Sequence, residues 1–77
     1  MGMKKVITVG VGEFSLKTGY DIYNTTNDLC RKHKVKCDLK DLAPMWGYKY
    51  YAILDGTEED INLIIKVLRT AFTVKVK

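Results

Sequence analysis

Two similar halves make up most of this chain of 77 residues, and each half reads as strand, helix and strand. In the first half, β-branched residues dominate positions 5–11 and predict a strand. Apolar residues then recur with the spacing of one helix face, which predicts a helix over positions 19–33. Polar and apolar residues alternate over positions 34–40, and this alternation predicts the second strand.

The second half repeats this order. Positions 48–54 are aromatic and β-branched, and we expect Asp55 and Gly56 to end the strand that these positions form. Positions 61–72 carry apolar residues at helical spacing, which predicts a second helix. Positions 73–77 alternate again and predict a short final strand.

A threonine introduces each predicted helix. Thr18 and Thr57 are each followed three residues later by an aspartate, which is the pattern of a helix-capping box. The order β-α-β-β-α-β predicts an α+β fold of the ferredoxin-like type, a four-stranded antiparallel sheet with both helices on one face. The opposite sheet face then has no cover. A chain this short allows a single domain over residues 1–77, and we expect residues 1–3 to be an added or disordered start.

Composition and motifs exclude several classes of protein. No apolar stretch approaches about 18 residues, so no membrane segment is predicted. No secretory signal pattern opens the chain, and we expect a cytoplasmic protein, in the host cytoplasm if the protein is viral. Cys30, His33 and Cys37 are too few for a structural zinc site, which takes four ligands, and the two cysteines are predicted to be free thiols. We therefore expect no metal and no cofactor.

Catalytic patterns are scarce as well. The single histidine has no serine or cysteine beside it in a recognisable arrangement. The segment before the first helix ends in Lys17 and Thr18, as a phosphate-binding loop does, but Val11 and Leu16 stand where that loop requires glycine. We predict no catalytic residues and a binding protein rather than an enzyme.

The uncovered sheet face is the first candidate for binding. The formal charge of the chain is +4, and alternation directs lysines of the second and fourth strands away from the helices. Tyrosines of the third strand would add aromatic rings to that face. Such a surface suits single-stranded nucleic acid, RNA above all, with rings stacked on bases and lysines near phosphates. The residues predicted for this role are Lys34, Lys36, Lys40, Tyr48, Tyr50 and Lys75.

Residues 46–53 resemble the aromatic third-strand motif of RNA recognition motifs. Gly47, Tyr48 and Tyr50 match that motif, whereas Trp46, Lys49 and Ile53 depart from it. The resemblance implies that Tyr48 and Tyr50 stack on bases.

A protein partner is the leading hypothesis. Met45 and Trp46 lie in a turn-forming stretch between two predicted strands, and tryptophan is a frequent anchor in protein interfaces. Together with Tyr48 and Tyr50, they are predicted to contact another protein or a second copy of this chain in a homodimer. A small phage protein that blocks a host enzyme is one setting that fits this size.

A third hypothesis concerns a small ligand. The order of strands and helices resembles that of ACT domains, which often place a glycine after the first strand, near an amino-acid pocket. The resemblance implies a regulatory ligand-binding domain in which Gly10 and Gly12 line the pocket.

Overall fold

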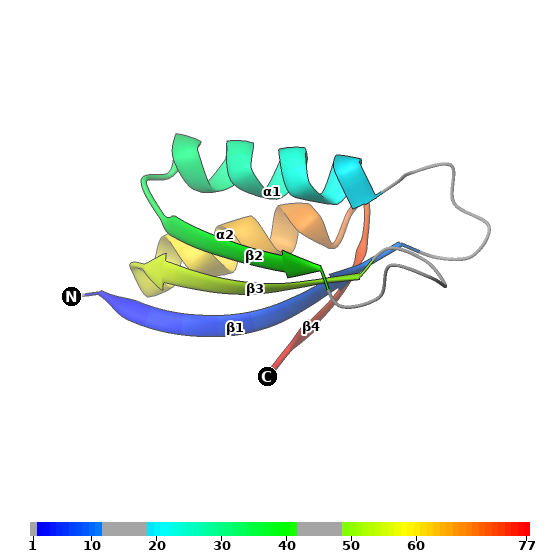
Figure 1. Ribbon diagram of the computed structural model, residues 1–77. Coiled ribbons are helices and arrows are strands. Elements are labelled where there is room, and N and C mark those ends of the chain that lie inside the picture. The colour runs from blue at the N-terminus through cyan, green and yellow to red at the C-terminus, as the bar shows by residue number, and fades with distance from the viewer. Residues whose placement is uncertain (1, 12–18, 42–48) are drawn as a thin grey trace.

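The computed structural model describes residues 2–11, 19–41 and 49–77, and it confirms the predicted α+β ferredoxin-like arrangement (Figure 1). Its elements follow the predicted order. They are β1 (Met3–Gly10), α1 (Gly19–Lys32), β2 (Lys36–Asp41), β3 (Lys49–Gly56), α2 (Glu58–Leu68) and β4 (Thr73–Val76).

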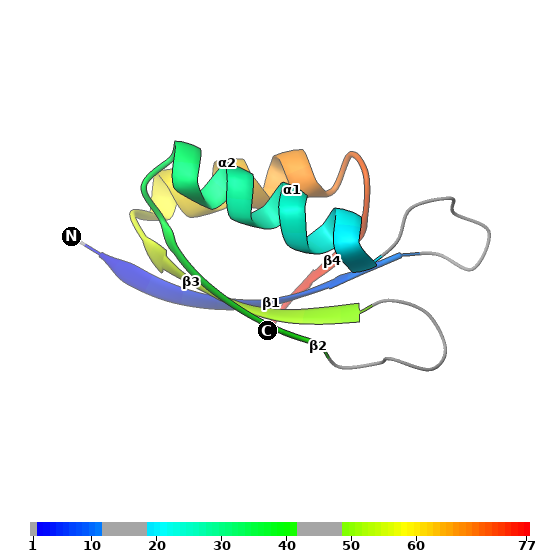
Figure 2. The same cartoon turned by 45° about the horizontal axis from the view of Figure 1, so that its top comes forward.

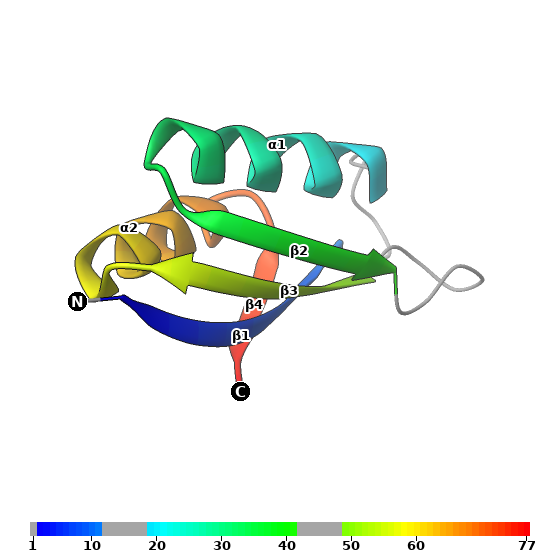
Figure 3. The same cartoon turned by 60° about the vertical axis from the view of Figure 1, so that its left-hand side comes forward.

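The four strands form one antiparallel sheet in the order β2-β3-β1-β4. Both helices lie on the same side of this sheet, and the described residues leave its other side uncovered (Figure 2). Strands β2 and β4 are the two edges, while β3 and β1 lie between them (Figure 3). The sheet therefore has one face buried by helices and one face open.

The hydrophobic core lies between the helices and the covered sheet face. Each helix contributes one apolar stripe, and each strand contributes alternate residues, as their periodicities require. The buried core consists of Ile7, Val9, Ile22, Cys30, Val35, Ala52, Leu54, Ile61, Ile64, Ile65, Leu68, Phe72 and Val74. Cys37 and Leu39 of β2 are partly buried and pack against it.

Helix α2 begins as the sequence predicts. The hydroxyl of Thr57 accepts a hydrogen bond from the backbone N–H of Asp60 at 3.2 Å and donates one to the Asp60 carboxylate at 2.9 Å. The helix ends at Leu68, before the last apolar positions of the predicted pattern. Phe72 is still buried in the core. Its N–H donates a hydrogen bond to the Leu68 carbonyl at 2.8 Å, which holds Phe72 close to the end of α2. Thr18, the other predicted cap, lies outside the described residues.

The paired strands β1 and β3 are longer than predicted. Asp55 and Gly56 do not stop the strand predicted over positions 48–54 but belong to it as the last two residues of β3, and Gly56 pairs with Met3 at the start of β1. Met3 is therefore part of the sheet and not of a disordered start. Gly56 suits this place because a Cβ there would lie 2.8 Å from Cγ2 of Val35, closer than two carbons can approach.

A tight turn joins α1 to β2 and delays the start of that strand. Lys34 has a φ of 57°, in the left-handed region. Its N–H bonds to the Arg31 carbonyl at 3.3 Å, and the N–H of Val35 bonds to the Cys30 carbonyl at 2.8 Å. This pair of bonds is the Schellman motif that commonly ends a helix, usually with glycine at the left-handed position.

Replacing Lys34 with glycine is expected to stabilise the protein. A side chain in the left-handed region is strained, whereas glycine adopts that conformation freely, and its larger entropy when unfolded offsets only part of the gain. We expect a gain of about 0.5–1 kcal/mol in the free energy of unfolding, measured by urea denaturation. Lys66→Gly, inside α2, is the matched control and should destabilise the protein by a similar amount. A loss of stability in Lys34→Gly would contradict the described turn.

Candidate functional site

The strand register assigns each sheet residue to one face. Ile7 and Val9 of β1 pair with Ala52 and Tyr50 of β3, and these residues point toward the helices. The alternate residues of the same strands therefore point away from the helices. We call the resulting uncovered surface the open face. Its members are Lys4, Val6, Thr8, Gly10, Lys36, Asp38, Lys40, Lys49, Tyr51, Ile53, Asp55, Thr73 and Lys75, together with Lys77, which contacts Tyr51.

Tyr51 lies near the centre of the open face. Directly opposite it stand Lys40 on β2 and Thr8 on β1, and Thr8 in turn stands opposite Lys75 on β4. The Nζ atom of Lys77 lies 5.2 Å from the centre of the Tyr51 ring, close enough for a cation–π interaction. Three lysines on both edges of the sheet thus surround one half-buried aromatic ring.

Beside Tyr51, the open face carries both apolar and charged residues. Val6 and Ile53 are half-buried neighbours of Tyr51 and add a small apolar area beside its ring. At the end of the sheet farthest from Gly10, Asp55 stands between Lys4 on β1 and Lys36 on β2. The open face has a shallow hollow at this end, lined by Lys4, Lys36, Cys37, Asp38, Ile53 and Asp55.

The open face concentrates positive charge. It carries six lysines, all of them exposed, against two aspartates. This difference of +4 equals the formal charge of the whole chain, so the other seven basic and seven acidic residues balance. Lys5 does not belong to this surface, because its Nζ bonds to Asn62 of α2 at 3.2 Å on the helix side. Within the described residues, the excess of positive charge therefore lies on the open face.

Three of the lysines predicted for nucleic-acid binding, Lys36, Lys40 and Lys75, lie on the open face. Lys34 does not, because it occupies the turn before β2. Lys77 joins the surface, as the alternation of the last strand predicts, and so do Lys4 and Lys49, which the sequence pattern did not single out for this role.

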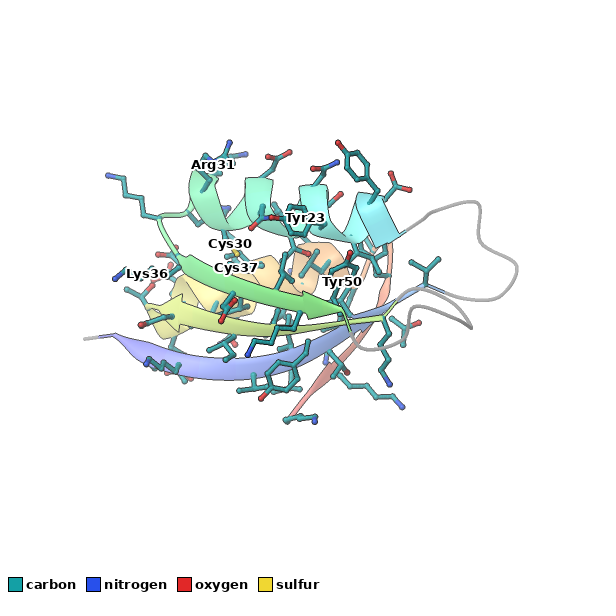
Figure 4. All side chains as sticks on the ribbon, in the orientation of Figure 1. Tyr23, Cys30, Arg31, Lys36, Cys37 and Tyr50 are labelled. Atoms are coloured by element: carbon teal, nitrogen blue, oxygen red, sulfur yellow. The ribbon has the colours of Figure 1, made fainter. Side chains whose placement is uncertain are left out.

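The structure corrects the placement of Tyr50. It lies on the helix-covered face, where its ring is 6.3 Å from that of Tyr23 on α1 (Figure 4). Adjacent strand residues point to opposite faces, so Tyr51 takes the open position instead. The motif resemblance implied the other parity. The sequence carries a signal for the observed orientation in the polarity of two neighbours. Lys49 and Asp55 lie on the same side of β3 as Tyr51, and their charges mark that side as the outward one.

The other predicted site residues lie at the loop end of the sheet. Met45, Trp46, Tyr48 and Gly12 are outside the described residues. Gly10 is the last residue of β1 and faces the open side, between Lys49 and Thr73 and at the opposite end from the hollow.

The two cysteines are free, as predicted, but they are not independent. Cys30 is buried on α1, Cys37 is half-buried on β2, and the two thiols share a hydrogen bond. Within residues 2–11, 19–41 and 49–77, no group of three or more histidine, cysteine or acidic side chains is placed to hold a metal ion.

Comparison with known proteins finds no matching family, no similar characterised protein and no similar solved structure. In the part of the chain that is described, no helix is long and apolar enough to cross a membrane. The open face is therefore the feature of the described structure that bears on function.

Proposed function

We propose that this chain is a non-catalytic binding domain whose open face binds single-stranded nucleic acid. The observation that carries the proposal is the position of Tyr51, a partly exposed ring in the middle of a sheet face with lysines on both sides. Aromatic rings stack on any base, and lysines beside them attract the phosphates that follow that base along the strand.

The dimensions of the face suit this use. Lys40 and Lys75 stand three strand spacings apart, which is about 14 Å across the sheet, with Tyr51 between them. A base stacked on Tyr51 therefore has cations within reach on both of its sides. All six basic residues of the open face are lysines, which act as flexible point charges rather than as rigid bidentate donors. We accordingly expect binding with little sequence preference.

The charge of the face also bears on the competing partners. A homodimer formed through the open face would bring two surfaces of net charge +4 together, and like charges in an interface cost several kcal/mol. A protein partner would have to present an acidic surface. The charge of the open face therefore favours single-stranded nucleic acid, a polyanion, over both a homodimer and a protein partner.

Two other hypotheses drawn from the sequence stay predictions. The first is that Met45 and Trp46 anchor a protein partner. The variant Trp46→Ala tests it, because the substitution should abolish capture of that partner and leave the thermal stability nearly unchanged. The ligand-binding hypothesis for Gly10 and Gly12 is tested by a thermal screen of metabolites, in which a ligand should raise the unfolding temperature.

The proposed function predicts a salt-dependent affinity. A labelled oligouridine of about ten nucleotides should bind at low salt, as measured by fluorescence anisotropy. Each phosphate that a lysine neutralises contributes about −0.7 to the slope of log affinity against log salt, so six lysines limit this slope to about −4. We expect a slope between about −2 and −4.

A pair of lysine variants controls this measurement. Lys40→Gln should make the slope shallower by about 0.7, because the open face then neutralises one phosphate fewer. Lys66→Gln, which removes an exposed lysine from α2, should leave the slope unchanged. Absence of binding at low salt, or equal effects of the two variants, would refute the proposal.

A further inference from the structure

The thiols of Cys30 and Cys37 meet between the C-terminal part of α1 and the beginning of β2 (Figure 4). Both are part of the packed interior, since Cys30 is 2% exposed and Cys37 packs against the core from the covered sheet face. They are the only two cysteines of the chain. This pair is independent of the proposed function of the open face.

The turn after α1 is what brings the thiols together. The hydrogen bond from the Val35 N–H to the Cys30 carbonyl holds the first residue after the turn against the last turn of the helix. Val35 points into the core, and side chains two residues apart on an extended chain share a face. Cys37 therefore points inward as well, toward the helix that carries Cys30, and its pairing with the buried Leu54 confirms that direction.

The hydrogen bond between the thiols makes them chemically unequal. Donation from the Cys37 S–H stabilises a thiolate on Cys30 and lowers the pKa of Cys30, although burial opposes this. The same bond, together with burial and the negative charges of Cys30 and Asp38, raises the pKa of Cys37. The pair therefore loses its first proton more readily than a buried thiol does alone, and it keeps the second.

We propose that Cys30 and Cys37 are a dithiol site that a peroxide converts into an intramolecular disulfide. One thiolate attacks a peroxide oxygen, the O–O bond breaks, and a sulfenic acid and hydroxide form. The neighbouring thiol then attacks the sulfenic sulfur, the S–S bond forms and water leaves. Overall, two thiols and one hydrogen peroxide give one disulfide and two water molecules, so the sulfurs are oxidised and the peroxide is reduced.

Access and geometry favour this reaction over further oxidation. Cys37 lies on the edge strand β2 and is half-buried, so a small oxidant reaches the pair from the edge of the sheet. A sulfenic acid formed there has its resolving thiol directly beside it, and it is consumed before a second peroxide arrives. The bridge would tie α1 to the strand that carries Lys36 and Lys40.

The test is stoichiometric oxidation of the folded, wild-type protein by hydrogen peroxide. We expect a monomer that has lost two hydrogens (about 2 Da by intact-mass spectrometry) and both titratable thiols, with full recovery after dithiothreitol. With only two cysteines, a monomeric disulfide can have no other pairing. Closing a loop this short without strain should raise the midpoint of thermal unfolding by on the order of 10 °C.

Three results would overturn the proposal. Thiols that resist peroxide in the folded protein but react in urea would show that the fold shields them from the oxidant. Products that carry one to three added oxygen atoms on Cys30 or Cys37, located by peptide mapping and so distinguished from oxidation of the three methionines, would show that no resolving thiol is in reach. A midpoint that stays or falls after oxidation would show that the native geometry does not accommodate the bridge. Cys30→Ser and Cys37→Ser should each remove the monomeric disulfide, because the chain has no third cysteine.

Discussion

Replacing Tyr51 with alanine is expected to weaken the binding of single-stranded oligonucleotide by roughly tenfold to a hundredfold. Stacking of one base on an aromatic side chain contributes about 1–3 kcal/mol, and Tyr51 is the aromatic residue that the described part of the open face offers. The loss should be similar at low and moderate salt, because it removes stacking and not charge. Anisotropy titrations of wild type and variant at two salt concentrations measure both quantities.

Tyr20→Ala is the matched control for this variant. Tyr20 is 73% exposed at the start of α1, on the helix layer and not on the sheet. Its removal should leave the affinity unchanged within a factor of about two. Equal losses in the two variants would place the nucleic acid elsewhere. Tyr51→Phe should retain most of the affinity, since the ring remains.

Leu54→Ala should have the largest effect on stability. Leu54 is fully buried on the inner strand β3 and points into the space between the sheet and the two helices. Truncating such a leucine costs about 2–5 kcal/mol, because apolar area is lost and a cavity is left. A domain of this size has a total stability of only about 4–12 kcal/mol. We expect a fall in the melting temperature of at least about 10 °C, measured by circular dichroism.

Leu63→Ala makes the same chemical change at the surface. Leu63 is 43% exposed on α2, and the variant should alter the free energy of unfolding by no more than about 0.5 kcal/mol. If Leu54→Ala proved equally mild, β3 would not have the helices packed against it, and the assignment of the open face would fail with it.

The fold could be predicted because its local signals agree. The apolar spacing around Ile22 and Ile61 locates one helix in each half, and Thr57 caps the second where the pattern begins. The alternation in β2 correctly directs Lys36 and Lys40 outward. Each of these signals lies within a few residues of the feature that it predicts.

The side of β3 that faces the helices was harder to predict. Tyr50 and Tyr51 are adjacent and chemically alike, so the two rings do not decide it, and the local signal is limited to Lys49 and Asp55, whose polarity marks the side of Tyr51 as outward. The choice depends on tertiary structure: Tyr50 meets Tyr23 on one side of the sheet, and Lys77 lies over Tyr51 on the other. The left-handed turn at Lys34 was missed for a related reason, because glycine usually marks such a turn and here a lysine occupies it.

The pairing of Cys30 with Cys37 also comes from tertiary structure. Their separation along the chain is compatible with metal ligands, and the absence of further ligands in the sequence favours independent thiols. The helix-ending turn changes this, because it folds β2 back under α1 and brings both sulfurs to one place.

Chemical-shift mapping of the isotope-labelled protein with a short oligouridine tests the central claim most directly. We expect the amide signals of Tyr51, Thr8 and Lys40 to move together as the oligonucleotide is added at low salt, and to return as salt rises. The signals of the exposed faces of α1 and α2 should stay in place. No movement at low salt, or movement confined to the helices, would contradict the assignment of the open face as the binding surface.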